Sequence, residues 1–105
     1  MLIQINTDSN IEGNERLAEQ VEAVVRDAVD RFSAQITRVK VHLSDENSGK
    51  KFGAGDKRCL LEARLAGLQP ISVTDEAATL EQAVDGAVEK LTRSLDSTLG
   101  RLGTR

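Results

Sequence analysis

Aromatic residues are almost absent from this 105-residue chain: it has no tryptophan or tyrosine, and Phe32 and Phe52 are its two phenylalanines. Domains that recognise single-stranded RNA commonly stack bases on aromatic side chains of an exposed sheet. We place Phe32 in the apolar stripe of a helix and Phe52 in a loop, which leaves no aromatic residue on a predicted strand. The sequence therefore excludes base stacking on a sheet, and any RNA binding would depend on shape and on contacts with phosphates.

Cysteine and histidine are equally scarce, with one of each, Cys59 and His42. A lone cysteine cannot close an intramolecular disulfide, which fits a reducing cytosol. The strand periodicity described below places Cys59 and His42 on opposite faces of a sheet, so they cannot act as a nucleophile and its base. No second histidine or cysteine completes a metal-ligand spacing. The sequence therefore predicts a protein without enzymatic activity, catalytic residues or a metal site.

Long apolar runs and a net positive charge are also missing. No segment approaches the roughly 20 apolar residues of a membrane-spanning helix, and the first residues lack the pattern of a signal peptide. The length suits one domain, which we expect to comprise residues 1–105. The net charge is −3 and the pI is near 5.1, whereas nucleic-acid-binding domains are typically basic. RNA binding would therefore require the positive charges to gather on one surface.

Alternation of apolar and polar residues with a period of two predicts four strands, at residues 2–7, 36–44, 58–66 and 71–74. The outward faces of the two middle strands carry Arg38, Lys40, His42, Leu60, Glu62 and Arg64. Residues 45–57 read as a loop because they are rich in Gly, Ser, Asn and Lys. The tight connection 67–70 favours antiparallel pairing of the last two strands.

Apolar residues at three- and four-residue spacing predict two amphipathic helices, at 17–32 and 80–102. Thr79 begins the spacing of a capping box at the start of the second helix. Gly86 inside this helix indicates a close backbone approach at this position, because glycine otherwise costs about 1 kcal/mol relative to alanine there. Glycines near the C-terminus predict a frayed end over residues 100–105.

The resulting element order is β-α-β-β-β-α, which places the chain in the α+β class. A four-stranded, mostly antiparallel sheet with two helices packed on one face lets the helical stripes and the inward strand faces share one core. The order contains the α-β-β-β-α arrangement of double-stranded-RNA-binding domains, preceded by one extra strand.

Segments spread over nearly the whole chain resemble a known family. The final-helix segment Ala83-Val84-Asp85-Gly86-Ala87-Val88-Glu89-Lys90-Leu91-Thr92-Arg93-Ser94-Leu95 is similar to a signature in which Ala-Ile-Asp leads into Asp-Lys-Leu, one further residue and Arg-Gln-Leu. Residues 3–6 and 36–44 are similar to strands of the same family. These segments resemble the short ribosome hibernation promoting factors, also called ribosome-associated inhibitor Y or sigma-54 modulation proteins.

The resemblance implies a bacterial, cytoplasmic protein that binds the small ribosomal subunit and its 16S rRNA. Such proteins lie in the channel for messenger and transfer RNAs and silence translation during stress. The resemblance further implies no enzymatic activity and no cofactor. Because the chain stops soon after Leu102, we expect a short form without the C-terminal domain that pairs ribosomes in long forms.

Lys90 and Arg93 match the signature, so the resemblance carries them over as RNA contacts. Exposure and charge alone add Arg26, Arg31, Lys40 and Arg101. The first helix departs from the family's usual basic character, because its acidic residues outnumber its basic ones. An alternative therefore stays open, in which a divergent member has lost RNA binding and uses its acidic surface to bind a protein partner or to self-associate. The exposed Leu60 and Leu68, near a possible sheet edge, would serve that alternative.

Overall fold

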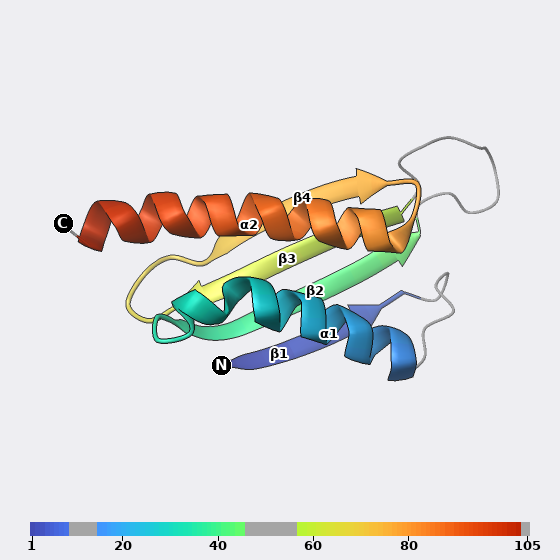
Figure 1. Cartoon of the computed structure of the whole chain (residues 1–105), viewed down its shortest axis with the longest axis horizontal. Helices are drawn as coiled ribbons and strands as arrows, with labels where there is room; N and C mark the ends of the chain where they lie inside the picture. Colours follow the sequence, from blue (N-terminus) through green and yellow to red (C-terminus); the bar gives the residue numbers. More distant parts are fainter. Residues whose placement is uncertain (9–14, 46–56, 104–105) are drawn as a thin grey trace.

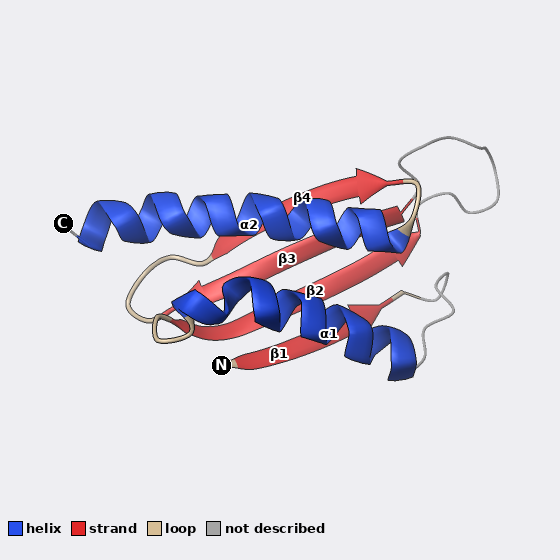
Figure 2. Cartoon of the chain, in the orientation of Figure 1, coloured by secondary structure: helices blue, strands red, loops and turns tan. Residues whose placement is uncertain are grey.

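The structure is a computed structural model that describes residues 1–8, 15–45 and 57–103, with side chains described as far as residue 100. Its elements follow the predicted β-α-β-β-β-α order (Figures 1 and 2). They are β1 (Leu2–Thr7), α1 (Glu15–Val29), the 3-10 turn η1 (Asp30–Phe32), β2 (Ile36–Asp45), β3 (Lys57–Leu65), β4 (Ile71–Ala77) and α2 (Leu80–Gly103). The predicted α+β class is therefore confirmed.

The strands form one mixed, four-stranded sheet in the order β1-β2-β3-β4. β2 pairs antiparallel with β3 and β3 with β4, whereas β1 pairs parallel with β2. Parallel neighbours need a crossover connection, and α1 lies in the crossover between β1 and β2. Both helices cover the same face of the sheet (Figure 1). The opposite face, called the open face below, includes the outward side chains of β2 and β3, which are Arg38, Lys40, His42, Ser44, Arg58, Leu60, Glu62 and Arg64.

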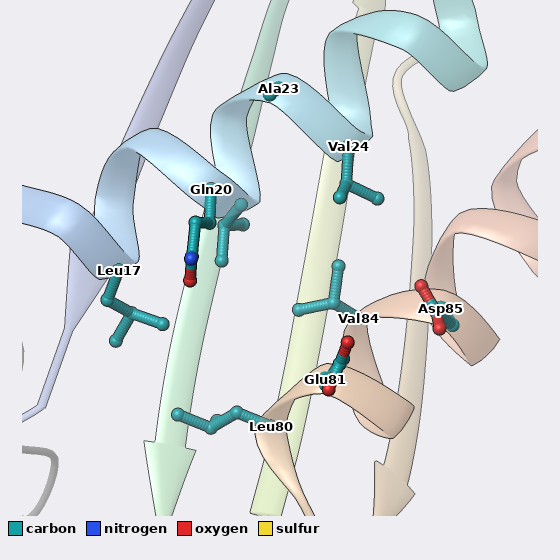
Figure 3. Close-up of a pocket in the computed structure, with 9 residues that line it drawn as sticks. Leu17, Gln20, Ala23, Val24, Leu80, Glu81, Val84 and Asp85 are labelled. Atoms are coloured by element: carbon teal, nitrogen blue, oxygen red, sulfur yellow. The ribbon is translucent and has the colours of Figure 1, made fainter.

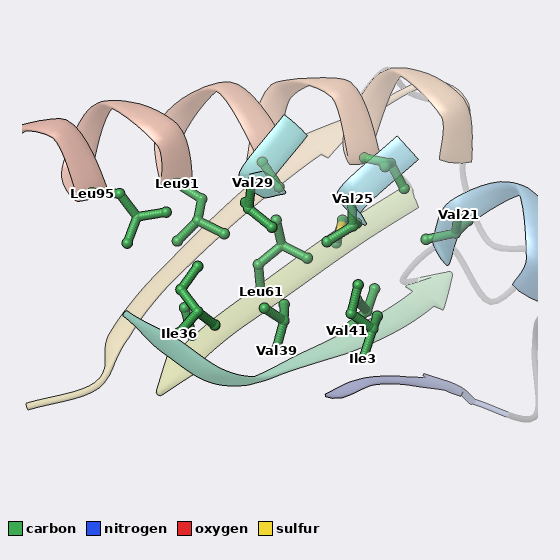
Figure 4. Close-up of a cluster of buried hydrophobic side chains, with 14 of the residues drawn as sticks. Ile3, Val21, Val25, Val29, Ile36, Val39, Val41, Leu61, Leu91 and Leu95 are labelled. Atoms are coloured by element: carbon green, nitrogen blue, oxygen red, sulfur yellow. The ribbon is translucent and has the colours of Figure 1, made fainter. Parts of the chain in front are cut away.

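A single apolar core lies between the sheet and the helices (Figure 4). Alternate strand residues point into it, so that Val39, Val41 and Leu61 are fully buried. The helices contribute residues at helical spacing, among them Val25 of α1 and Leu91 of α2. The described residues include no buried polar or charged residue. The two periodicities in the sequence therefore serve one shared core.

The strand ends differ from the prediction by a few residues. β2 reaches Asp45 and β3 begins at Lys57, and an ion pair of 3.2 Å between Lys57 Nζ and Asp45 Oδ2 joins these ends. The loop predicted over 45–57 is therefore shorter by both end residues, and residues 46–56 lie outside the described part of the chain. β4 continues past Thr74 to Ala77, because β3 offers it pairing partners as far as Lys57.

The helix ends follow the local signals. α1 ends at Val29, and η1 extends its apolar stripe to the buried Phe32. Thr79 Oγ1 accepts a hydrogen bond of 3.1 Å from the backbone N–H of Gln82, as the predicted cap requires. α2 runs to Gly103, so helical backbone extends into the segment 100–105 that was expected to fray; residues 104–105 lie outside the described residues. Neither helix within the described ranges has the length and apolar composition of a membrane-spanning segment.

Candidate functional site

Arg26 and Arg93, two of the predicted RNA contacts, each pair with a glutamate one helical turn earlier. Arg26 Nη2 lies 2.7 Å from Glu22 Oε2, and Arg93 Nη2 lies 2.9 Å from Glu89 Oε2. All four side chains are solvent-exposed, and such pairs stabilise a helix by only about 0.3–0.5 kcal/mol. Their main effect is therefore electrostatic, since each glutamate offsets the positive charge that its arginine would present to a phosphate.

Lys90, the other residue carried over from the resemblance, joins α2 to β4. Its Nζ lies 3.0 Å from Asp75 Oδ1 and donates a hydrogen bond of 2.7 Å to the carbonyl oxygen of Thr74. Asp75 points toward α2, and its carboxylate occupies the space that a Cβ at Gly86 would need. The close approach predicted at the Gly86 backbone is confirmed, and the group that approaches it is the Asp75 carboxylate. Lys90 thus already has a structural partner for its charge.

Arg31 of η1 makes two hydrogen bonds to Asp96 of α2. Its Nη1 donates to Oδ1 at 2.9 Å and its Nη2 donates to Oδ2 at 3.1 Å. The guanidinium carbon also lies 4.3 Å from the centre of the Phe32 ring, within the range of a cation–π contact. The hydrogen bonds raise the pKa of Arg31 and lower the pKa of Asp96. Arg31 therefore links the end of the first helical segment to the second half of α2.

The six predicted RNA contacts do not form one patch within the described residues. Lys40 lies on the open face of the sheet, on the opposite side from the helices. Arg101 belongs to α2, but its side chain lies outside the described residues. The other four residues lie in the helical layer, where each makes an ion pair with a carboxylate. Of the described basic side chains on that layer, Arg16 alone makes none.

The open face carries basic side chains of a different kind. Those of Arg38, Lys40 and Arg64 make no ion pair within the described part of the chain. Arg38 and Arg64 are directly opposite each other in the register of β2 and β3. Like charges in this position repel, and opposite charges are the stabilising arrangement. The sheet therefore holds an arginine pair that adds nothing to its own stability.

A bulge in β2 produces the arginine pair. Ile36 pairs with Leu65 and Arg38 pairs with Arg64, so that Thr37 is an extra residue in β2. Without the bulge, Ile36 and Arg38 would point to the same face, because strand side chains alternate. With it, Ile36 is buried in the core and Arg38 points outward. Thr37 Oγ1 also donates a hydrogen bond of 3.2 Å to the carbonyl oxygen of Arg64, which ties the bulge to β3.

Sequence reasoning placed Arg38 and Arg64 on the outward faces but did not identify them as a candidate site. Alternation gives the face of each residue, whereas the pairing of the two residues depends on the register between their strands. The register between β2 and β3 depends on the length of the connection between the two strands and on the bulge in β2. The alternation of apolar and polar residues within each strand reveals neither of these. Two arginines on outward faces of consecutive strands were the available clue.

His42 and Cys59 lie on opposite faces of the sheet, as predicted. The His42 side chain is exposed on the open face, and Cys59 is fully buried in the core. Burial and, second, the charge of Asp75 raise the pKa of the Cys59 thiol to about 12. A thiol of this kind is protonated at neutral pH and a poor nucleophile.

An apolar groove of about 520 Å³ lies between α1 and α2 (Figure 3). Leu17 and Val24 line it from α1, and Leu80 lines it from α2. The exposed Glu81 and Asp85 stand at its side, and its lining contains no basic residue. The groove is therefore unsuited to a phosphate and suited to an apolar group with neighbouring positive charge.

The two leucines singled out in the sequence occupy different environments. Leu68 is exposed in the turn after β3, at 40% of its full accessibility. Leu60 is half-exposed on β3, which is an inner strand, so its predicted place near a sheet edge is wrong. The exposed apolar residue at an edge is Leu2 of β1, at 53%.

Comparison with known proteins places these observations in a family. The N-terminal domain of Protein Y from Thermus thermophilus has a similar structure, with a TM-score of 0.74 and 28% sequence identity over 93% of this chain and 99% of that chain. A ribosomal subunit interface protein from Coxiella burnetii shares the fold, with a TM-score of 0.72 and 17% identity over 95% of this chain and 99% of that chain. No curated protein matches significantly. The model of one sequence family matches residues 3–102, and this nearly complete match shows that the chain belongs to the sigma 54 modulation protein / S30EA ribosomal protein family.

Proposed function

We propose that this protein is a ribosome hibernation factor, which binds the small ribosomal subunit through phosphates of its rRNA and thereby inhibits translation. The observation that carries the proposal is the family match over residues 3–102. In this role the protein acts in the cytoplasm, has no catalytic activity and needs no cofactor.

The distribution of charge supports binding to RNA despite the net charge of −3. In α1, the acidic residues Glu15, Glu19, Glu22 and Asp27 outnumber Arg16 and Arg26. On the open face, Arg38, Lys40, Arg58 and Arg64 of β2 and β3 outnumber the acidic residues Glu62 of β3 and Glu76 of β4. The positive charge is thus concentrated on the side of the molecule away from the acidic helices. Concentration of this kind is what a polyanion-binding protein with an acidic pI requires.

The lack of Phe, Tyr and Trp on the described open face supports phosphate contact as the mode of binding. Phe32 is buried in the core, and His42 is the one described aromatic ring on the open face. A single imidazole ring gives little surface for base stacking, so recognition would depend mainly on shape and on the RNA backbone.

Co-sedimentation of the purified protein with isolated small subunits tests the proposal. We expect near-stoichiometric pelleting at low salt that falls steeply at moderate salt, because each neutralised phosphate contributes close to one unit to the slope of log affinity against log salt. Isolated large subunits control for general attraction to rRNA. Equal pelleting with both subunits, or none with the small subunit at low salt, would contradict the proposal.

A second candidate function is binding of a protein partner, and the apolar groove between α1 and α2 favours it. Its apolar lining beside Glu81 and Asp85 complements a helix with leucine-like side chains flanked by lysine or arginine. A synthetic leucine–lysine helical peptide, titrated into isotope-labelled protein, should then shift the NMR signals of Leu17, Val24 and Leu80. A peptide of equal charge with serine in place of leucine is the control. Identical shifts from both peptides would exclude this function.

A further inference from the structure

We propose that the open face of the sheet, centred on Arg38 and Arg64 with Lys40 beside them, is a binding surface for the phosphodiester backbone of folded RNA. This assignment rests on the proposed function and deepens it, because it moves the expected phosphate contacts from the helices to the opposite side of the molecule. It rests on the register, on the partners of the charged side chains and on the chemistry of the surface.

The register brings Arg38 and Arg64 together through the bulge at Thr37. A regular β2 that kept Ile36 in the core would turn Arg38 inward as well. The bulge therefore has two effects. It keeps Ile36 in the core, and it turns Arg38 outward, opposite Arg64. An anion bound between the two guanidinium groups would convert their repulsion into two attractive contacts.

Within the described part of the chain, no ion pair compensates the charge of Arg38 or Arg64, although Glu62 lies two residues before Arg64 on the same face. On the β1 side, the register partner of Arg38 is Leu2 and that of Lys40 is Gln4, and neither carries a charge. On the β3 side, Lys40 faces Glu62, but no ion pair forms between them in the structure. By contrast, the candidates Arg26, Arg31, Lys90 and Arg93 in the helical layer each have a carboxylate partner within 3.0 Å.

The side chains of this surface suit phosphate better than other anions, and they suit the phosphates of folded RNA better than those of a single strand. A guanidinium donates two parallel hydrogen bonds to a phosphate, and two adjacent guanidinium groups with an ammonium suit an array of phosphates better than a single anion. Among the described residues this face carries no Phe, Tyr or Trp, and His42 is its one aromatic ring, so it lacks the row of rings on which successive unpaired bases would stack. A duplex backbone, recognised by charge and shape, fits these properties.

The test compares two double variants that lose the same charge. R38Q/R64Q removes the arginine pair from the open face, and R26Q/R93Q removes two exposed arginines from the helices. Binding is measured with a 20-base-pair RNA duplex by fluorescence anisotropy over a range of salt, and with small subunits by co-sedimentation. We expect R38Q/R64Q to weaken duplex binding at least tenfold at low salt and to reduce the salt slope by nearly two units, at about 0.9 per phosphate. R26Q/R93Q should change the slope by less than half a unit.

Other results would overturn the assignment. Unchanged duplex binding by folded R38Q/R64Q, or a larger loss of duplex affinity in R26Q/R93Q, would indicate that the helices and not the open face contact the phosphates. Competition by polyglutamate as strong as competition by RNA of equal charge would identify an acidic protein as the ligand instead. Circular dichroism and thermal unfolding of each variant exclude misfolding as the cause. If wild type fails to pellet with small subunits, the proposed function fails; if it pellets and R38Q/R64Q pellets equally well, only the assignment to the open face fails.

Discussion

At the scale of a single residue, Cys59 is protected by its surroundings. It is fully buried on β3, and its register partner on β4 is Asp75. Because burial and the carboxylate raise its pKa to about 12, we expect native protein at pH 8 not to react with an aromatic disulfide reagent that labels accessible thiols. Complete labelling should appear in urea above the unfolding midpoint. Rapid stoichiometric labelling of native protein would contradict the burial of this thiol.

Arg64 offers a second residue-scale prediction, in which stability and binding change in opposite directions. Replacing Arg64 by Glu places opposite charges across the β2–β3 ladder, and we expect the free energy of unfolding at low salt to rise by up to about 1 kcal/mol. Duplex-RNA binding should fall in the same variant. Urea unfolding measures the first quantity. In an Arg38→Gln background, Arg64→Glu should leave the free energy of unfolding nearly unchanged. An equal gain in that background would show that the interaction with Arg38 does not cause the stabilisation.

At the scale of elements, the contact between β4 and α2 depends on Gly86 and Asp75. Because the Asp75 carboxylate occupies the space of a Cβ at position 86, Gly86→Ala should lower the free energy of unfolding by about 1–3 kcal/mol through overpacking. In an Asp75→Ala background the carboxylate is gone, and the higher helix propensity of alanine should make Gly86→Ala stabilising by up to about 1 kcal/mol. Urea unfolding of the four proteins in a double-mutant cycle checks this change of sign. Destabilisation in both backgrounds would contradict it.

The link between η1 and α2 should make stability depend on pH. The hydrogen bonds from Arg31 lower the pKa of Asp96, so the folded state loses this proton more readily than the unfolded state. The stabilisation is present above the ordinary aspartate pKa of about 3.9 and disappears as pH falls through the lowered value. We expect the difference in unfolding midpoint between wild type and Asp96→Asn to be largest at pH 7 and to shrink toward pH 2.

Asp27→Asn is the matched control for this pH dependence, because Asp27 is exposed and makes no ion pair with a described residue. Its midpoint difference from wild type should be smaller at pH 7 than that of Asp96→Asn. A difference for Asp96→Asn that stays constant between pH 7 and pH 2 would show that the Arg31–Asp96 pair does not stabilise the fold. Both series belong at low ionic strength, since salt screens exposed charges.

At the scale of the whole molecule, periodicity predicted the fold and which residues face the core. Ile3, Val41 and Val25 occupy the buried positions that alternation or helical spacing indicates. The candidate site was less accessible to sequence reasoning, because it depends on contacts between distant segments. Arg31 is exposed as expected, but its partner Asp96 lies 65 residues further along the chain. Local patterns place a charge on a surface; the fold decides whether that charge is already paired.

β1 is joined to the rest of the sheet by a single parallel ladder with β2, and we expect it to unfold separately from the other strands. β2, β3, β4 and α2 follow one another along the chain, so their contacts close short loops. β1 lies at one edge of the sheet. Its pairing with β2 closes a longer segment of chain, which includes α1, so it costs more loop-closure entropy than the pairing of β3 with β4.

We therefore expect native-state amide hydrogen exchange to show β1 opening in a partial unfolding event while β3 remains closed. The amides of Ile3 and Ile5 should exchange faster than those of Leu61 and Ala63, and their opening should expose less surface, seen as a weaker dependence on denaturant. Equal protection with equal denaturant dependence would mean that the sheet opens only as a whole. If the two pairs of amides differ as expected, the strand that is paired in parallel is the least stable part of the sheet.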